Sequence, residues 1–205
     1  MLLSSLKGSN PCVTLESMPE AQEGSSAPVQ PTDAVPLRVL MPSPIGHLGV
    51  ELRGTAVTRL RIDPAPEDRI LFTPLHKIDG SDVLDEIFGH LSEYFAGARR
   101  KVEVEIDLVP CGVDGLARRV LKETIKIPYG RTRTFQGLAE AVGRPEAYRQ
   151  VLSVLLENPI PILIPCHRVV PHKGGCGSYV GGTDRKRWLL EMESRPADDA
   201  GSEPL

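Results

Sequence analysis

From Leu37 to about Asp63 the chain alternates between apolar and polar positions, with turn residues between the apolar runs. Ser43–Gly46 and Arg53–Gly54 carry turn signals between residues 37 and 63. A period of two is typical of strands with one buried face, so this stretch predicts hairpins. The alternation is carried by Val50, Leu52, Leu60 and Ile62.

The pattern then changes to helical spacing. This spacing predicts an amphipathic helix that ends at Gly97. After it, Val102, Val104 and Ile106 alternate again and predict another strand. Residues 37–107 together therefore predict a small N-terminal α/β domain. The helical face is formed by Leu84, Ile87, Phe88, Leu91, Tyr94 and Phe95.

Residues 107–115 contain one proline and two glycines and predict a linker, after which helical patterns dominate. One helix is expected before Pro128, a short one over 135–142, and a third from Pro145 to about Leu156. The last two, joined by a turn at Gly143, predict a helix-turn-helix. A final helix capped by Asp184 is expected to run to Glu193. Residues 113–194 form the predicted C-terminal domain.

The two ends of the chain differ from this pattern. Residues 1–36 and 195–205 are rich in small, polar and proline residues, so both tails are predicted to be disordered. No apolar run reaches 18 residues and no signal peptide is evident, so no membrane partner is expected. The four cysteines follow no framework spacing, which favours reduced thiols and a cytoplasmic or nucleoid-associated protein. They are Cys12, Cys111, Cys166 and Cys176.

Charge is unevenly distributed. The chain as a whole has a net charge of −3, but residues 113–193 hold 13 Lys/Arg and 8 Asp/Glu, a net of +5. The local field governs phosphate binding more than the total does, so the C-terminal domain is compatible with a nucleic-acid partner.

The candidate chemistry lies in a proline-rich apolar run from Asn158 to Val170. Its three prolines exclude a helix interior or a central strand, so we expect an extended, buried segment that delivers Cys166 to a substrate. A free thiol with a pKa of about 8.5 is a weak nucleophile at neutral pH. A lowered pKa for Cys166 and a nearby base are therefore expected. Adjacent residues in an extended chain point to opposite sides, so direct contact between His167 and Cys166 is not assumed.

Other interpretations of these residues remain open. Cys166 could be a small buried apolar residue, since free cysteine is often buried. It could also serve a cysteine hydrolase, which requires an oxyanion hole and a directly bonded base. A zinc site is a further alternative, but the spacing of Cys166, His167, His172 and Cys176 does not match paired-ligand patterns, so no metal is expected.

The run resembles the active-site signature of the O6-alkylguanine-DNA alkyltransferases, which has an Asn-Pro pair followed by Pro-Cys-His-Arg-Val. Asn158–Pro159 and Pro165–Val169 match it, and further blocks match at Ile127–Thr132, Gly143–Pro145, Gly177–Gly182 and Arg185–Glu193. The resemblance is strong over 113–193 and looser over 37–112. It implies an α/β (α+β) protein with an RNase H-like N-terminal domain and a winged helix-turn-helix in the C-terminal domain.

The resemblance also implies the activity. A methylated-DNA–protein-cysteine methyltransferase would move the alkyl group from O6-alkylguanine in double-stranded DNA to Cys166 once, as a monomer and without a cofactor. The alternative is a non-enzymatic alkyltransferase-like sensor, a type that lacks the cysteine. O4-alkylthymine as a further lesion, and a zinc in the N-terminal domain, are left open by the sequence.

The resemblance assigns roles to particular residues. Glu193 would orient His167, with a water between His167 and Cys166, and Asn158 would bond across the turn. Phe135 stands where the family has a tyrosine that can protonate the base, and Tyr148 is larger than expected in the recognition helix. DNA contact and base flipping are assigned to Arg149, Phe135, Ala147, Thr134 and Arg168. The substrate pocket is assigned to Pro161, Val169, Tyr179, Val180 and Lys186.

Overall fold

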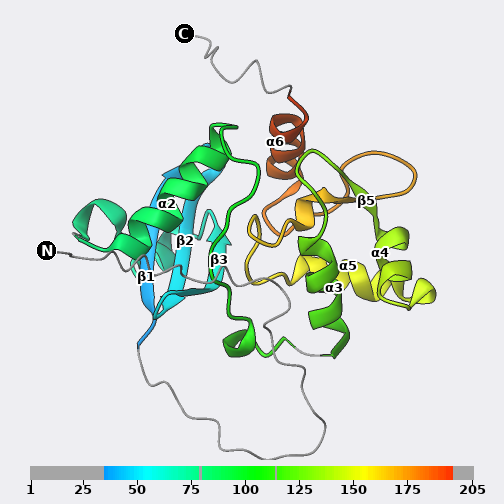
Figure 1. The fold of residues 1–205 in the computed structure, drawn as a ribbon, viewed down its shortest axis with the longest axis horizontal. Coiled ribbons are helices and arrows are strands. Elements are labelled where there is room, and N and C mark those ends of the chain that lie inside the picture. Colours follow the sequence, from blue (N-terminus) through cyan, green and yellow to red (C-terminus); the bar gives the residue numbers. More distant parts are fainter. Residues whose placement is uncertain (1–34, 79, 114, 196–205) are drawn as a thin grey trace, which may run out of the picture. The chain divides into compact units, whose positions relative to one another are not determined.

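The computed structural model describes residues 35–78, 80–113 and 115–195 (Figure 1). The predicted disorder of the two tails falls outside these residues, apart from the few at their inner ends. All described residues fall within one structural unit. We refer to residues 37–107 as the N-terminal region and to residues 113–194 as the C-terminal region.

Three strands of the N-terminal region form the predicted hairpins. β1 (Leu37–Ser43), β2 (Gly46–Arg53) and β3 (Ala56–Ile62) pair antiparallel, and the short β4 (Thr73–Pro74) lies parallel to β1, giving the order β3-β2-β1-β4. Gly46 has φ of +104° in the first turn, and a Cβ there would lie 2.9 Å from Asp63 Cγ. Only glycine makes this turn without strain.

The predicted helix crosses the sheet as α2 (Asp82–Phe95). Ser81 caps its start with a hydroxyl that accepts a hydrogen bond from the Leu84 amide, and Gly97 follows shortly after its end with φ of +74°. The apolar face named from the sequence is the face that packs inward. Its fully buried members are Leu84, Ile87, Phe88, Leu91 and Tyr94. The region also contains α1 (Pro66–Arg69) and two short 3-10 turns, Leu75–Lys77 and Val109–Cys111.

The strand predicted over residues 102–106 is wrong. Only Ile106 forms a bridge, to Val57 on the free edge of β3. Further along β3, the Leu60 amide on the same edge donates to the carbonyl of Pro159 at 2.8 Å. The bridge to Val57 is parallel, so residues 102–104 come level with the turn between β2 and β3, where there is no strand for them to pair with.

The C-terminal region is mainly helical, as predicted. It contains α3 (Gly115–Ile125), α4 (Phe135–Ala141), α5 (Tyr148–Leu156) and α6 (Thr183–Ser194), with β5 (Arg133–Thr134) parallel to β6 (Val169–Val170). A 3-10 turn at Pro145–Ala147 leads into α5.

The predicted cap of the last helix is wrong. Gly182 occupies the cap position of α6 and no side chain caps it. Asp184 lies inside the first turn, where the positive end of the helix dipole stabilises a carboxylate, and it pairs with Arg187.

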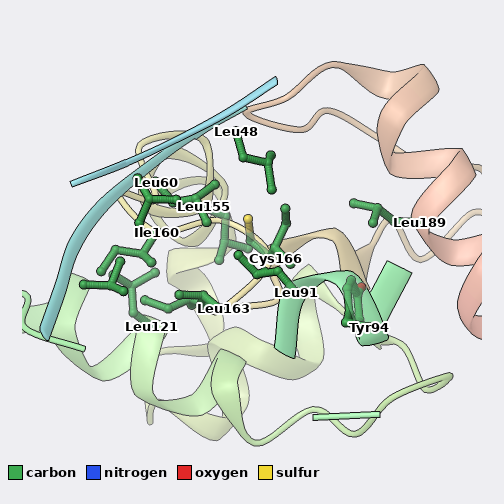
Figure 2. Close-up of a cluster of buried hydrophobic side chains, with 14 of the residues drawn as sticks. Leu48, Leu60, Leu91, Tyr94, Leu121, Leu155, Ile160, Leu163, Cys166 and Leu189 are labelled. Carbon is green, nitrogen blue, oxygen red and sulfur yellow. The ribbon is translucent and has the colours of Figure 1, made fainter. Parts of the chain in front are cut away.

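Buried apolar side chains of both regions belong to one cluster. Figure 2 shows Leu48 and Leu60 of the sheet, Leu91 of α2 and Leu189 of α6 around Cys166. The candidate nucleophile therefore lies in a packed apolar interior. Among the described residues, no helix has both the length and the apolar character needed to cross a membrane.

Candidate active site

The proline-rich run is buried but turned, which corrects the expectation of an extended segment. The Ile164 amide donates to the Ile160 carbonyl, and Ile162 adopts φ of +75°, which is uncommon for a β-branched residue. Residues 166–168 form a 3-10 turn. Alternation of side chains along an extended strand therefore does not apply to Cys166 and His167.

Asn158 closes this turn with its side chain. Its Nδ2 donates to the Ile164 carbonyl at 2.9 Å and to Cys166 Sγ at 3.0 Å, and its Oδ1 accepts from the Ile160 amide. The amide is 3 % exposed, so both its donor and acceptor groups are satisfied inside the protein. Asn158 therefore fixes the turn and touches the sulfur.

The Cys166 thiol has a raised pKa, contrary to the lowered value expected from the sequence. Burial raises it to about 11, against hydrogen bonding from Asn158 and the positive charge of Lys186, which lower it. Removal of water disfavours the thiolate more than these partners favour it. At rest Cys166 is a neutral thiol.

His167 is completely buried and bonded to a carboxylate. Its Nε2 lies 3.0 Å from Glu193 Oε1, while its Nδ1 is buried without a hydrogen-bond partner among the described residues. Burial lowers the pKa of His167, although Glu193 raises it. A neutral imidazole with one nitrogen held and the other free can accept a proton.

Glu193 is the centre of this polar group. Arg168 donates through Nε to Oε2 at 2.9 Å and through Nη2 to Oε1 at 2.8 Å, and the Gly130 amide donates to Oε2. Burial raises the pKa of Glu193, but the hydrogen bonds from His167 and Arg168 lower it by more than burial raises it, so the pKa is about 2. Because His167 is neutral, the bidentate Arg168 pair is the main cause.

Arg168 is placed differently from its predicted role at the DNA. It is 7 % exposed, and its remaining nitrogen, Nη1, donates to the Ile127 carbonyl at 2.7 Å. All three guanidinium nitrogens are bonded inside the protein and the side chain is buried, so Arg168 is not placed to meet a phosphate. Arg168 is a clamp on Glu193.

Tyr94 also bonds to this carboxylate, although the sequence pattern indicated only a core position for it. Its hydroxyl donates to Glu193 Oε1 at 2.7 Å and lies 3.5 Å from His167 Nε2. A tyrosine on a buried helical face is the signal that could have found it, because a buried phenol seeks a polar partner. Gly130 likewise stood out in the sequence only as part of a motif.

Lys186 is buried beside the nucleophile. Its Nζ donates to the carbonyls of Val169 and Ser178 and lies 5.6 Å from the centre of the Phe135 ring. Burial lowers its pKa to about 8, although Cys166 raises it. Tyr179 is buried too, its hydroxyl has no partner among the described residues, and burial raises its pKa.

A cavity of about 330 Å³ lies against the run that carries Cys166. Asn158, Pro161 and Val180 line it, together with side chains of β3 and the loop after it. Cys166, Val169, Tyr179 and Lys186 are not among its lining residues, and Asn158 is the lining residue that touches the sulfur. The predicted pocket residues therefore divide between this cavity and the buried surroundings of Lys186.

The predicted DNA-facing residues lie on α4 and α5. Arg149 is exposed, and its Nε donates to the hydroxyl of Tyr148 at 3.1 Å. Ala147 is 7 % exposed, and the Thr134 hydroxyl caps α4 by accepting from the Gly137 amide. Phe135 begins α4, half-buried. Arg149 is thus the most accessible of this set.

Comparisons with known proteins show the family of the chain. The model of the 6-O-methylguanine DNA methyltransferase DNA-binding domain matches residues 115–195. A methylated-DNA–protein-cysteine methyltransferase of Mycobacterium bovis is 38 % identical over 160 residues, 76 % of this chain and 92 % of that protein. The chain belongs to this methyltransferase family.

Solved structures of the family also match. The O6-methylguanine methyltransferase of Mycobacterium tuberculosis has a TM-score of 0.66 at 36 % identity, covering 80 % of this chain and 97 % of that one. A structure of Mycobacterium tuberculosis OGT in complex with DNA has a TM-score of 0.64 at 35 % identity, with the same coverages. The mixed α and β architecture is therefore that of the family.

Proposed function

We propose that the chain is a DNA repair protein that transfers the alkyl group of O6-alkylguanine to Cys166. The observation that carries the proposal is the buried group formed by Cys166, Asn158, His167 and Glu193. A thiol touched by one amide, next to a neutral imidazole whose far nitrogen is held by a carboxylate, has the parts of an activated nucleophile.

The reaction is a single displacement. The Cys166 proton passes to His167 Nδ1 through one water, and the sulfur attacks the alkyl carbon. An S–C bond forms as the C–O6 bond breaks, and its electron pair stays on guanine. The Val180 amide donates to O6 of the guanine. The proton held by His167 passes to the departing guanine, since Phe135 carries no hydroxyl to supply one. Guanine and S-alkylcysteine are the products.

The raised pKa of Cys166 fits this sequence of events. A buried neutral thiol is a poor target for small electrophiles in solution, because the thiolate is the reactive form. Deprotonation is then coupled to substrate binding, with the charge of Lys186 beside the sulfur favouring the thiolate. In the protein without DNA, Cys166 should therefore react slowly with a small thiol reagent. A lowered pKa, as expected from the sequence, would instead have given a fast reaction.

The DNA partner is supported by the family and by the accessible Arg149. A base inside a duplex cannot reach a buried sulfur, so the lesion must be extruded at a cost of a few kcal/mol. Arg149 enters the duplex and pairs with the orphaned base. Thr134 and Ala147 support α4 and α5 from within. The extruded lesion approaches through the cavity lined by Asn158, Pro161 and Val180, since Asn158 connects this cavity to the Cys166 sulfur.

Each molecule acts once, because a thioether has no easy route back to a thiolate. The DNA itself supplies the alkyl group, so the reaction requires no cofactor, and the proposed active form is a monomer. The non-enzymatic sensor is not favoured, since those proteins lack the cysteine that follows Pro165 here.

Intact-mass measurement tests the proposal. Incubation with excess duplex DNA carrying O6-methylguanine should add one methylene to the protein, located on Cys166 by peptide mapping, and consume one lesion per molecule. Cys166→Ala should gain no mass and still bind the lesion, while the matched Cys111→Ala should react like the wild type. Repeated turnover, or a methyl group on another residue, would contradict the mechanism.

A further inference from the structure

One buried ionisable side chain takes no part in the reaction described above. Tyr94 lies on α2 in the N-terminal region, 99 positions before Glu193, and is 1 % exposed. Its ring packs edge-on against Tyr129 and Phe95, and this packing explains why an aromatic ring is present at the position. Packing does not account for a hydroxyl at this depth, since phenylalanine would fill the same space without a polar group to satisfy.

The Tyr94 hydroxyl shares one acceptor with the imidazole. Glu193 Oε1 lies 2.7 Å from Tyr94 Oη, 3.0 Å from His167 Nε2 and 2.8 Å from Arg168 Nη2. A carboxylate can only accept, so the phenol must donate its proton. Burial and Glu193 both raise the pKa of Tyr94, which keeps the phenol protonated and able to donate.

We propose that Tyr94 is a positioning residue for alkyl transfer, which sets the basicity of His167 through the oxygen that they share. The inference rests on the proposed function. Negative charge that the phenol withdraws from Oε1 is no longer available to stabilise an imidazolium. Tyr94 thus keeps His167 neutral, with Nε2 toward Glu193 and Nδ1 free for the proton of Cys166. The N-terminal region therefore completes the reaction centre.

Other charged groups around the pair do not replace this effect. Arg168 and Lys186 both disfavour a protonated His167 by their charge, and Cys166 is neutral at rest. Arg168 already bonds both oxygens of Glu193. The hydroxyls of Tyr129 and Tyr179 make no hydrogen bond to Glu193 or His167 among the described residues. Tyr94 is the phenol in this group that bonds to Oε1.

The test removes only the hydroxyl. Tyr94→Phe keeps the ring contacts, and Tyr129→Phe is the matched control, because it makes the same chemical change on the neighbouring ring. The pKa of His167 is read by NMR titration of the imidazole in the full chain without DNA, with the signal assigned by its loss in His167→Gln. We expect Tyr94→Phe to raise this pKa by roughly half a unit to one unit and Tyr129→Phe to leave it unchanged.

A second measurement follows the reaction. The single-turnover rate with O6-benzylguanine as free base should fall about 3- to 10-fold for Tyr94→Phe on the acid side of the pH profile, as that midpoint moves up by the same shift. At high pH the rate should change far less. A purely structural role would lower the rate equally at every pH.

A third variant removes dependence on the stability of Tyr94→Phe. Incorporation of 3-fluorotyrosine at position 94 gives a more acidic phenol and a stronger donor, so the pKa of His167 should fall. An unchanged His167 titration in both Tyr94 variants overturns the inference. The titration is informative even where no alkyl transfer occurs, so failure of the inference and failure of the proposed function are distinguishable.

Discussion

The buried group around Glu193 and the exposed face of α5 represent opposite ways of placing functional side chains. Glu193 receives hydrogen bonds from Tyr94, His167, Arg168 and the Gly130 amide, which lie far apart in the sequence. Among the described residues, the hydrogen bond and the ring contact of the Arg149 side chain are both with its neighbour Tyr148. The groups proposed to transfer the proton are fixed by the fold, whereas the group proposed to meet DNA is left free.

This difference explains which departures from the family pattern the fold tolerates. Tyr148 is 43 % exposed, so its size costs the interior nothing. A change at Glu193 or Arg168 would leave a buried charge unpaired. Substitutions on the exposed face of α5 should therefore change stability little, and substitutions in the buried group around Glu193 should lower it. Variants at these two sites should also differ in which substrates they affect and in their dependence on pH.

The largest expected effect comes from the base. His167→Ala should slow single-turnover transfer by about 10²- to 10⁴-fold, because no group remains to take the Cys166 proton. The loss should be equal on methylated duplex DNA and on free O6-benzylguanine, since both need the thiolate. A loss confined to duplex DNA would place His167 in DNA recognition and break the comparison.

The next effect is on stability. Arg168→Met removes the clamp and leaves Glu193 buried, so the free energy of unfolding should fall by about 3–5 kcal/mol in urea titrations. Arg149→Met, the same change at an exposed site, should stay within about 0.5 kcal/mol of the wild type. Similar losses of stability for the two variants would show that burial does not distinguish Arg168 from Arg149.

Acid should act on the same group. The pKa of Glu193 is about 2 in the folded protein against an ordinary 4.5, so its contribution of about 3 kcal/mol is present above pH 4.5 and is lost as pH falls toward 2. The lowered pKa of His167 adds loss in the same direction below pH 6.5. Unfolding midpoints measured across this range should fall more gently in Glu193→Gln, whereas Arg149→Met should keep the slope of the wild type.

The smallest expected effect concerns the exposed face. Arg149→Ala should slow repair of duplex DNA by roughly 10- to 100-fold, because nothing then compensates for part of the extrusion cost. Reaction with free O6-benzylguanine should stay within about two-fold, as a free base pays no such cost. Equal losses on both substrates would indicate a folding defect rather than a role in flipping.

The sequence predicted the elements better than their junctions. Periodicity found the hairpins, α2 and the helix-turn-helix because each buries a regular face. It failed for residues 102–106, most of which lie level with the turn before β3, and for the run before Cys166, where Asn158 folds the chain into turns. The first outcome depends on where a distant strand begins, and the second on side-chain hydrogen bonds of Asn158, neither of which a pattern of apolar positions contains.

The site shows the same limit. Motif order pointed to Cys166, His167 and Glu193, which the fold brings together in the C-terminal region. It did not separate Arg168 from the DNA-facing residues, because an arginine in a motif does not reveal its partner. Nor did it reach Tyr94, whose hydroxyl meets Glu193 only once α2 has packed against the C-terminal region. The pKa of Cys166 was misjudged because the depth of burial is a property of the whole fold.

Asn158 also bears on how the protein ages. Asparagine side chains deamidate when the amide nitrogen of the following residue attacks the side-chain carbonyl and closes a five-membered ring. The following residue here is Pro159, which has no N–H to make that attack. The amide is also held by Ile160, Ile164 and Cys166. The residue on which the geometry of the sulfur depends is thus protected from a common chemical decay, so an unused molecule keeps its turn intact while it waits for a lesion.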